Sequence, residues 1–159
     1  NNDIQFVLLG SGDSKYIDEL EKIATRHPHQ IALNIGYDAT VPNYIYSGCD
    51  TFLMPSRFEP CGLGQMIALK YGTLPIVRST GGLNDTVLRY DTLTKKGNGF
   101  TFQNYDSNEM KNTILYAYDV FANKKSDWDL LIKRAMKEEN SVKKSTSNYV
   151  KLYKIIHEN

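Results

Sequence analysis

Short apolar runs alternate with longer amphipathic stretches along residues 4–102. The apolar runs are rich in β-branched residues and end at glycine, proline or polar residues, which is typical of buried strands. The predicted strands are residues 4–9, 31–35, 51–54, 74–78 and 99–102. The stretches between the strands place apolar residues three and four positions apart, which is typical of helices packed on one face. The predicted helices are residues 14–26, 41–48, 63–71 and 83–87.

This alternation of strands and helices favours an α/β fold, with a mostly parallel sheet covered by helices on both faces. Beyond residue 106 the pattern predicts helices only. They are residues 107–122, about 126–136 and 145–157. We therefore expect one Rossmann-like α/β domain over residues 1–106, with a helical C-terminal segment over residues 107–159 packed on the same domain.

The composition is that of a globular domain, and it excludes several classes of function. Of the 159 residues 41% are hydrophobic, which is enough for a core and excludes wholesale disorder. The formal net charge is +1, which argues against binding nucleic acid through a basic surface. No run approaches the roughly 20 apolar residues of a membrane span. Two cysteines indicate no disulfide framework, so we expect a reducing compartment, the cytoplasm or a plastid.

The most informative segment follows the third predicted strand, where ligands of open parallel sheets bind. The backbone N–H groups of Leu63 and Gly64 would be free donors at the positive end of helix 63–71, which suits a phosphate. Glu59 repels phosphate but can accept hydrogen bonds from sugar hydroxyls. The loop therefore suggests a sugar phosphate or a nucleotide sugar. Its spacing also fits a tight strand-to-helix turn with a surface Arg57–Glu59 pair.

Two further segments lie at predicted strand ends. Thr80, Gly81 and Gly82 follow the fourth strand and open a helix, so their amides suit a second polar rim beside the first loop. Tyr37 follows the second strand, and its ring suits stacking on a nucleotide base. Both have a structural alternative, because glycines commonly form turns and tyrosines commonly pack against other side chains.

Motif spacing disfavours other kinds of chemistry. The dinucleotide fingerprint G-x-G-x-x-G fails after the first strand because the third glycine is replaced by Lys15, and no P-loop sequence is present. Cys61 has no histidine near it in sequence, so we expect it to line a pocket or fill space and not to act as a nucleophile. No acidic pair with metal-ligand spacing follows a strand, so we expect no metal ion and no cofactor.

Several segments together resemble the C-terminal domain of bacterial glycogen synthases and plant starch synthases. They are LLGSGD at 8–13, IGYD at 35–38, SRFEPCGL at 56–63, ALKYGTLP at 68–75 and TGGLNDTV at 80–87. The resemblance covers about residues 4–102, and the tail is similar only loosely, in residues 149–153. It implies the C-terminal half of a two-domain GT-B fold with its active site in the cleft. It also implies transfer of glucose from ADP-glucose, or UDP-glucose in some members, to the non-reducing end of an α-1,4-glucan with retention of configuration.

The resemblance implies how the sugar is held. Glu59, the implied catalytic residue, would bind glucose hydroxyls, and Cys61 and Gly62 would line the sugar and phosphate pocket. Retaining glucosyltransferases with a Glu-x₇-Glu motif have a second glutamate where this chain has Ile67. Of the two glutamates in that motif, the resemblance can therefore assign a role only to the first, Glu59.

The resemblance also implies how the nucleotide is held. Leu63 and Gly64 would give backbone amides to the distal phosphate, and Tyr37 would stack on the base. Many family members have threonine at the position of Gly64, which removes a possible hydroxyl contact but keeps the amide. Amides and cations stabilise a departing diphosphate without a metal ion, which agrees with the expectation of none.

Parts of the family's site are missing from this chain. In the family, an arginine and a lysine that neutralise the diphosphate lie upstream, and the catalytic histidine and the glucan-binding surface belong to an N-terminal domain. We expect the family's first β–α unit to be absent as well; its strand usually lies between the equivalents of residues 4–9 and 51–54. Its loss would leave two apolar strand edges unpaired. We therefore expect the isolated chain to be inactive and to self-associate.

Two alternative functions remain open. One is another retaining GT-B glucosyltransferase, such as sucrose synthase, which the FEPCG pentapeptide at 58–62 disfavours. The other is a non-catalytic nucleotide-binding or regulatory module that has kept the pocket. A gene that continues upstream into a second, glucan-binding domain would favour the enzyme over the module.

Overall fold

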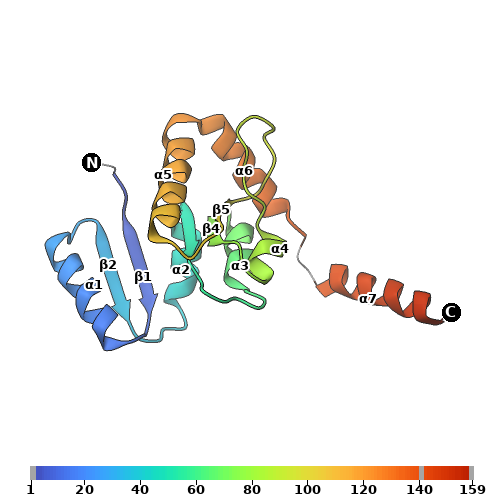
Figure 1. Ribbon diagram of the computed structural model, residues 1–159, viewed down its shortest axis with the longest axis horizontal. Coiled ribbons are helices and arrows are strands. Elements are labelled where there is room, and N and C mark those ends of the chain that lie inside the picture. Colours follow the sequence, from blue (N-terminus) through green and yellow to red (C-terminus); the bar gives the residue numbers. More distant parts are fainter. Residues whose placement is uncertain (1–2, 140–141, 158–159) are drawn as a thin grey trace. The chain divides into compact units, whose positions relative to one another are not determined.

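The computed structural model describes residues 3–139 and 142–157, and its contacts divide the chain into two compact units, Asn1–Gly48 and Cys49–Asn159. The first unit holds β1 (Phe6–Gly10), α1 (Ser14–Arg26), β2 (Ile31–Ile35) and α2 (Val41–Gly48). The second unit holds β3 (Thr51–Met54), α3 (Gly64–Tyr71), β4 (Leu74–Arg78), α4 (Gly82–Thr86), β5 (Phe100–Phe102), α5 (Ser107–Asn123), α6 (Lys125–Lys137) and α7 (Val142–His157) (Figure 1).

The first unit is a pair of parallel strands joined by a helical crossover. β1 pairs with β2, with Leu8 opposite Leu33, and α1 packs against β2. Asp13 begins α1 by accepting a hydrogen bond from the Lys15 N–H at 2.9 Å. None of the described residues of this unit is buried, because two strands with two helices are too few to enclose a side chain.

The second unit is a three-stranded parallel sheet with β4 at its centre. Leu53 of β3 lies opposite Ile76 of β4, and Ile76 lies opposite Phe100 of β5. Alternate side chains of β4 point to opposite faces of the sheet, and both faces are covered. The face with Leu74 and Ile76 packs against α5 and α6, whereas Val77 packs against α4 on the other face. The central strand is therefore almost wholly buried.

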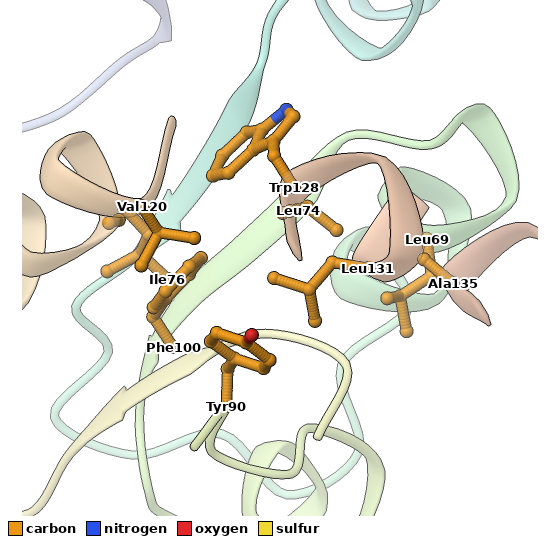
Figure 2. Close-up of a cluster of buried hydrophobic side chains, with 10 residues drawn as sticks. Leu69, Leu74, Ile76, Tyr90, Phe100, Val120, Trp128, Leu131 and Ala135 are labelled. Carbon is orange, nitrogen blue, oxygen red and sulfur yellow. The ribbon is translucent and has the colours of Figure 1, made fainter. Parts of the chain in front are cut away.

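The larger core cluster lies between this sheet and the helices α5 and α6 (Figure 2). Its buried members are Leu69, Leu74, Ile76, Tyr90, Phe100, Ala117, Val120, Trp128, Leu131 and Ala135. The Trp128 ring stacks on Phe100 with 6.1 Å between the ring centroids, and Phe121 meets Trp128 edge-on at 5.1 Å. This core supports the strands whose carboxyl ends carry the candidate site.

The predicted α/β class is confirmed, with parallel strands and helices on both faces of the sheet in the second unit. The strands form two parallel sheets, β1-β2 and β3-β4-β5, whereas the alternation predicted a single sheet. Among the described residues β1 pairs only with β2, and β3 pairs only with β4. These are the two strands for which the resemblance predicts an edge without a partner.

The helices after residue 106 differ in how they pack. α5 and α6 contact β4 and each other, and α6 also contacts α3. α7 starts at Val142, earlier than the predicted residue 145, and its apolar side chains, such as Leu152 and Ile156, are exposed. The division into a nucleotide-sugar-binding region over 1–106 and a helical segment over 107–159 stays a prediction. No helix within the described residues is long and apolar enough to cross a membrane.

Candidate functional site

Three loops of the second unit meet at one edge of its sheet, because parallel strands end on the same side. They are residues 55–63 after β3, 79–81 after β4 and 103–106 after β5. The Ser79 N–H donates to the Phe102 carbonyl at 2.8 Å, and the Gly82 N–H donates to the Glu59 carbonyl at 3.1 Å. The loops therefore form one connected surface.

Arg78, the last residue of β4, holds two of these loops through its guanidinium group. Its Nη1 donates to the carbonyls of Arg57 at 2.8 Å and Ser56 at 3.3 Å, and its Nε donates to the Gln103 carbonyl at 3.1 Å. The guanidinium also lies 5.8 Å from the centre of the Tyr105 ring. Arg78 was not among the predicted site residues. The sequence signal for it is a charged residue that closes an otherwise apolar strand.

Gly81 and Gly82 let the second loop lie directly on the backbone of the first. A Cβ atom at Gly81 would lie 2.0 Å from the Glu59 carbonyl oxygen, and one at Gly82 would lie 2.0 Å from the Cys61 carbonyl oxygen. Gly81 also has a φ of 47°, which side chains rarely allow. The glycines therefore permit a close approach in addition to forming a turn. Thr80, half-buried, immediately precedes them.

Glu59 has a carboxylate that the protein engages only weakly. Its Oε2 lies 3.5 Å from the Ser56 Oγ, which is a long contact. The structure records no ion pair between Glu59 and Arg57, both of which it describes, so the surface pair that the spacing also allowed is not found. The carboxylate is available to accept hydrogen bonds from a ligand, while the Gly82 N–H holds the backbone of the same residue.

Helix α3 begins without a side-chain cap. Leu63 occupies the N-cap position but provides no capping hydrogen bond, and Gly62 before it has a φ of 70°. The first helical bond runs from the Ile67 N–H to the Leu63 carbonyl at 3.0 Å. The N–H groups of Leu63 and Gly64 have no hydrogen-bond partner within the part of the chain that the structure describes. Uncapped donors at the positive end of a helix favour an anion, and Cys61 is exposed just before them.

Gln65 is a residue of this region that sequence reasoning missed. It is fully buried, and its Nε2 donates to the Gly62 carbonyl at 2.9 Å and to the Thr86 Oγ1 at 3.1 Å. The signal was present in the sequence, because Gln65 stands three and four residues before Ala68 and Leu69 on the buried face of α3. A polar residue on an apolar helix face indicates a specific hydrogen bond inside the protein.

Tyr37 lies in the first unit, on the loop after β2. Gly36 before it has a φ of 133°, and Asp38 after it accepts hydrogen bonds from the N–H groups of Val41 at 2.8 Å and Thr40 at 2.6 Å. These bonds, that of Val41 first, hold the pKa of Asp38 below its ordinary value. The Tyr37 side chain is 94% exposed, so it does not pack within its own unit. The ring is available for stacking.

A separate polar cluster ties the loop over residues 90–98 to α6. The Lys95 Nζ lies 2.6 Å from the Asp127 Oδ2. The hydrogen bond from Lys95 holds the pKa of Asp127 below its ordinary value. Burial, and then the neighbouring Asp127, raises the pKa of Tyr90. No group of three or more His, Cys, Asp or Glu side chains suited to a metal ion occurs in residues 3–139 and 142–157.

The chain is thus a parallel α/β domain with an uncapped helix start, a weakly engaged carboxylate and two interlocked loops at its strand ends, the edge at which open parallel sheets bind ligands. The chain belongs to the family of glycosyl transferases group 1, whose model matches residues 1–144. The family match confirms the resemblance that the sequence motifs indicated.

Two glycogen synthases and one starch synthase of known structure are among the proteins similar to this chain. The glycogen synthase of Thermosipho africanus is 50% identical over 153 residues, which are 96% of this chain and 32% of that protein. The glycogen synthase of Bacillus anthracis is 51% identical over 156 residues, 98% of this chain and 33% of that protein. A solved structure of the catalytic domain of starch synthase IV from Arabidopsis thaliana, bound to ADP and acarbose, is also similar, with a TM-score of 0.82 and 40% sequence identity. The match covers 94% of this chain and 32% of the starch synthase chain. The chain therefore spans about a third of the length of these relatives.

Proposed function

We propose that this chain is the donor-binding half of a glucosyltransferase that transfers glucose from ADP-glucose, or UDP-glucose, to the non-reducing end of an α-1,4-glucan with retention of configuration. One observation carries the proposal: the backbone of residues 59–61 lies directly on Gly81 and Gly82, immediately before the uncapped start of α3. The Glu59 carboxylate, which suits sugar hydroxyls, and the Leu63 and Gly64 N–H groups, which suit a phosphate, belong to this same segment, and this supports the proposal. The similarity to glycogen synthases, and to a starch synthase bound to ADP, supports this choice of substrates.

The proposed phosphate site lies at the N-terminus of α3. The N–H groups of Leu63 and Gly64 bind the distal phosphate, and residues 80 and 81 form a second polar rim beside them, while the Gly82 N–H donates to the Glu59 carbonyl. When the bond between glucose and phosphate breaks, negative charge grows on the departing diphosphate, and donors that already point at it stabilise the transition state. This stabilisation requires no metal ion, so we propose a site that works without a cofactor.

The sugar and the base of the donor are proposed to be bound by different residues. Glu59 accepts hydrogen bonds from glucose hydroxyls and holds the sugar for attack, while Cys61 and Gly62 line the pocket around it. Tyr37 stacks on the nucleotide base through its exposed ring. In this assignment a carboxylate binds the sugar hydroxyls, backbone N–H groups bind the phosphate, and an aromatic ring stacks on the base.

We propose that the acceptor glucan binds to a domain outside this chain. The remaining catalytic groups belong to the same domain. The chain spans about a third of its relatives' length, which leaves room for such a domain. The isolated chain should then bind nucleotide weakly and transfer no glucose. A cytoplasmic location, expected from the cysteine usage, is part of the same proposal.

The test is a titration of the full-length protein with ADP-glucose and with UDP-glucose, in the presence of glycogen as acceptor. We expect saturable transfer of glucose to glycogen from at least one of the two donors. Nucleotide binding without any transfer would favour the non-catalytic module instead. Transfer to fructose in place of glycogen would favour an enzyme of the sucrose synthase type. Binding of neither nucleotide sugar would overturn the proposal.

We also propose that the isolated chain self-associates through the free edges of β1 and β3, which pair, among the described residues, only with β2 and with β4 respectively. Phe6 and Val7 of β1 are 38% and 39% exposed, and apolar strands with an open edge tend to pair with other chains. Light scattering should give a mass above that of one chain, and Val7→Lys, which adds a charge to the edge strand, should lower that mass. A monodisperse monomer for the unmodified chain would contradict this.

A further inference from the structure

Gln65 is a polar side chain without exposed surface, and its contacts join two loops of the candidate site. Its Nε2 donates to the Gly62 carbonyl at 2.9 Å and to the Thr86 Oγ1 at 3.1 Å, with a longer contact of 3.4 Å to the Cys61 carbonyl. The Thr86 Oγ1 in turn donates to the Gly82 carbonyl at 2.7 Å. One chain of hydrogen bonds therefore connects the loop before α3 with the start of α4.

The amide group of Gln65 fills the space in which a side chain at position 62 would lie. A Cβ atom at Gly62 would be 2.6 Å from the Gln65 Oε1 and 2.9 Å from its Nε2. The Oε1 itself is buried without a hydrogen-bond partner among the described residues, which is unfavourable for a polar atom. An apolar side chain of the same length would avoid this penalty. The distinctive contribution of glutamine here is therefore the pair of hydrogen bonds from its Nε2.

The hydrogen bond to the Gly62 carbonyl sets the direction of the next N–H group. The peptide unit between Gly62 and Leu63 is planar and trans, so its C=O and N–H bonds point in opposite directions. The carbonyl points at the buried Gln65, and the Leu63 N–H consequently points away from the interior of the domain. This N–H group has no partner among the described residues, and it is one of the two donors assigned to the distal phosphate.

We propose that Gln65 is a positioning residue for the nucleotide sugar: it holds the peptide between Gly62 and Leu63 so that the Leu63 N–H faces the diphosphate, without touching the ligand. The inference rests on the proposed function of the loop. Without the Nε2 donor the peptide can rotate, and an N–H group that must be reoriented on binding holds the charged diphosphate less tightly than a fixed one.

The experiment compares four variants of the full-length protein with the wild type. Gln65→Met keeps the length of the side chain and removes both donors. Thr86→Val removes the hydroxyl that continues the hydrogen-bond chain, and Thr86→Ser keeps it. Gln30→Met, at an exposed glutamine of the first unit, controls for the change of residue type. The measurements are the KM for the nucleotide sugar, the KM for glycogen, the Kd of ADP and of UDP by calorimetry, and the midpoint of thermal unfolding.

Gln65→Met should raise the KM for the nucleotide sugar and the Kd of the nucleotide diphosphate by about tenfold, as for a lost hydrogen bond to a charged group. The KM for glycogen should stay unchanged. Thr86→Val should show the same pattern with a smaller change, while Thr86→Ser and Gln30→Met should match the wild type. The split between the two KM values separates positioning from a general effect on folding, which would change both.

Folded Gln65→Met with wild-type KM and Kd values would overturn the inference, as would equal rises in the KM for donor and acceptor. Where Gln65→Met does not fold, the two Thr86 variants decide: equal donor KM values for valine and serine would overturn it. A wild-type protein that binds neither ADP nor UDP would overturn the proposed function and the inference with it. Wild-type nucleotide binding therefore distinguishes failure of the Gln65 assignment from failure of the proposed function.

Discussion

Gly82→Ala tests whether the close contact between the two loops holds the site together. The added Cβ atom would lie 2.0 Å from the carbonyl oxygen of Cys61 and 2.6 Å from its carbonyl carbon. An ordinary van der Waals contact needs about 3.4 Å, so the two backbones would have to separate by about 1.4 Å. Such a separation breaks the 3.1 Å hydrogen bond from the Gly82 N–H to the Glu59 carbonyl.

The size of the effect follows from these two changes. Overpacking against a fixed backbone costs about 1–3 kcal/mol, and loss of one hydrogen bond costs about 0.5–1.5 kcal/mol. We expect the free energy of unfolding of the second unit to fall by about 2–4 kcal/mol. In the full-length protein, a displacement of Glu59 by about 1 Å should lower kcat by about 100-fold.

The assay is urea unfolding followed by tryptophan fluorescence, together with the kcat of glucosyl transfer. Trp128 is the one tryptophan of the sequence and lies in the core of the second unit, so its fluorescence reports on the unit that holds the loops. Gly48→Ala is the matched control, because a Cβ atom there meets nothing within 4 Å. A wild-type unfolding midpoint and a wild-type kcat for Gly82→Ala would refute the reasoning.

Three further predictions concern single side chains. Glu59→Ala should lower kcat at least about 100-fold and leave ADP affinity within about threefold, because the carboxylate is proposed to bind the sugar and not the nucleotide; equal losses in kcat and affinity would show that Glu59 supports the loop instead. Tyr37→Ala should weaken ADP binding in calorimetry by about 1–3 kcal/mol, and Tyr37→Phe, which keeps the ring, should not. Asp127→Asn should make the urea midpoint less sensitive to acid. The hydrogen bond from Lys95 keeps the pKa of Asp127 low, so its stabilisation is present above the unfolded-state pKa and is lost as pH falls through the folded one. Parallel pH profiles for wild type and variant between about pH 6 and pH 2 would contradict this.

The fold class could be predicted because parallel strands buried on both faces leave a strong pattern. β4 is a continuous apolar run that ends at Arg78, and its predicted and observed bounds agree. Helix starts were less predictable where no side chain caps them. α6 begins at Lys125, after an N-cap residue Lys124 whose side chain makes no capping bond, whereas the predicted start was about residue 126.

The candidate site could be predicted where its chemistry lies within one loop. Glu59 and the N–H groups of Leu63 and Gly64 follow one another in sequence, so their combination was visible. Contacts between residues of different loops are not visible in the sequence in this way. The partner of Gln65 at Thr86 stands 21 residues away, and the need for glycine at Gly82 arises from the Cys61 carbonyl on another loop. Sequence reasoning therefore predicted candidate groups within one loop and missed Gln65, whose hydrogen bonds cross to Thr86.

The residues proposed to bind the donor belong to units that differ in burial, and this bears on the choice of nucleotide. The loops around Glu59 follow strands packed on a buried core, whereas Tyr37 follows a strand of a unit in which no described residue is buried. Segments with few buried contacts open most readily, and the proposed base contact belongs to the unit with fewer buried residues. Stacking is also tolerant of base identity, because every base has a π-face. Tyr37 can thus add affinity for ADP and UDP alike, and discrimination between them must come from groups that hydrogen-bond to the edges of the base.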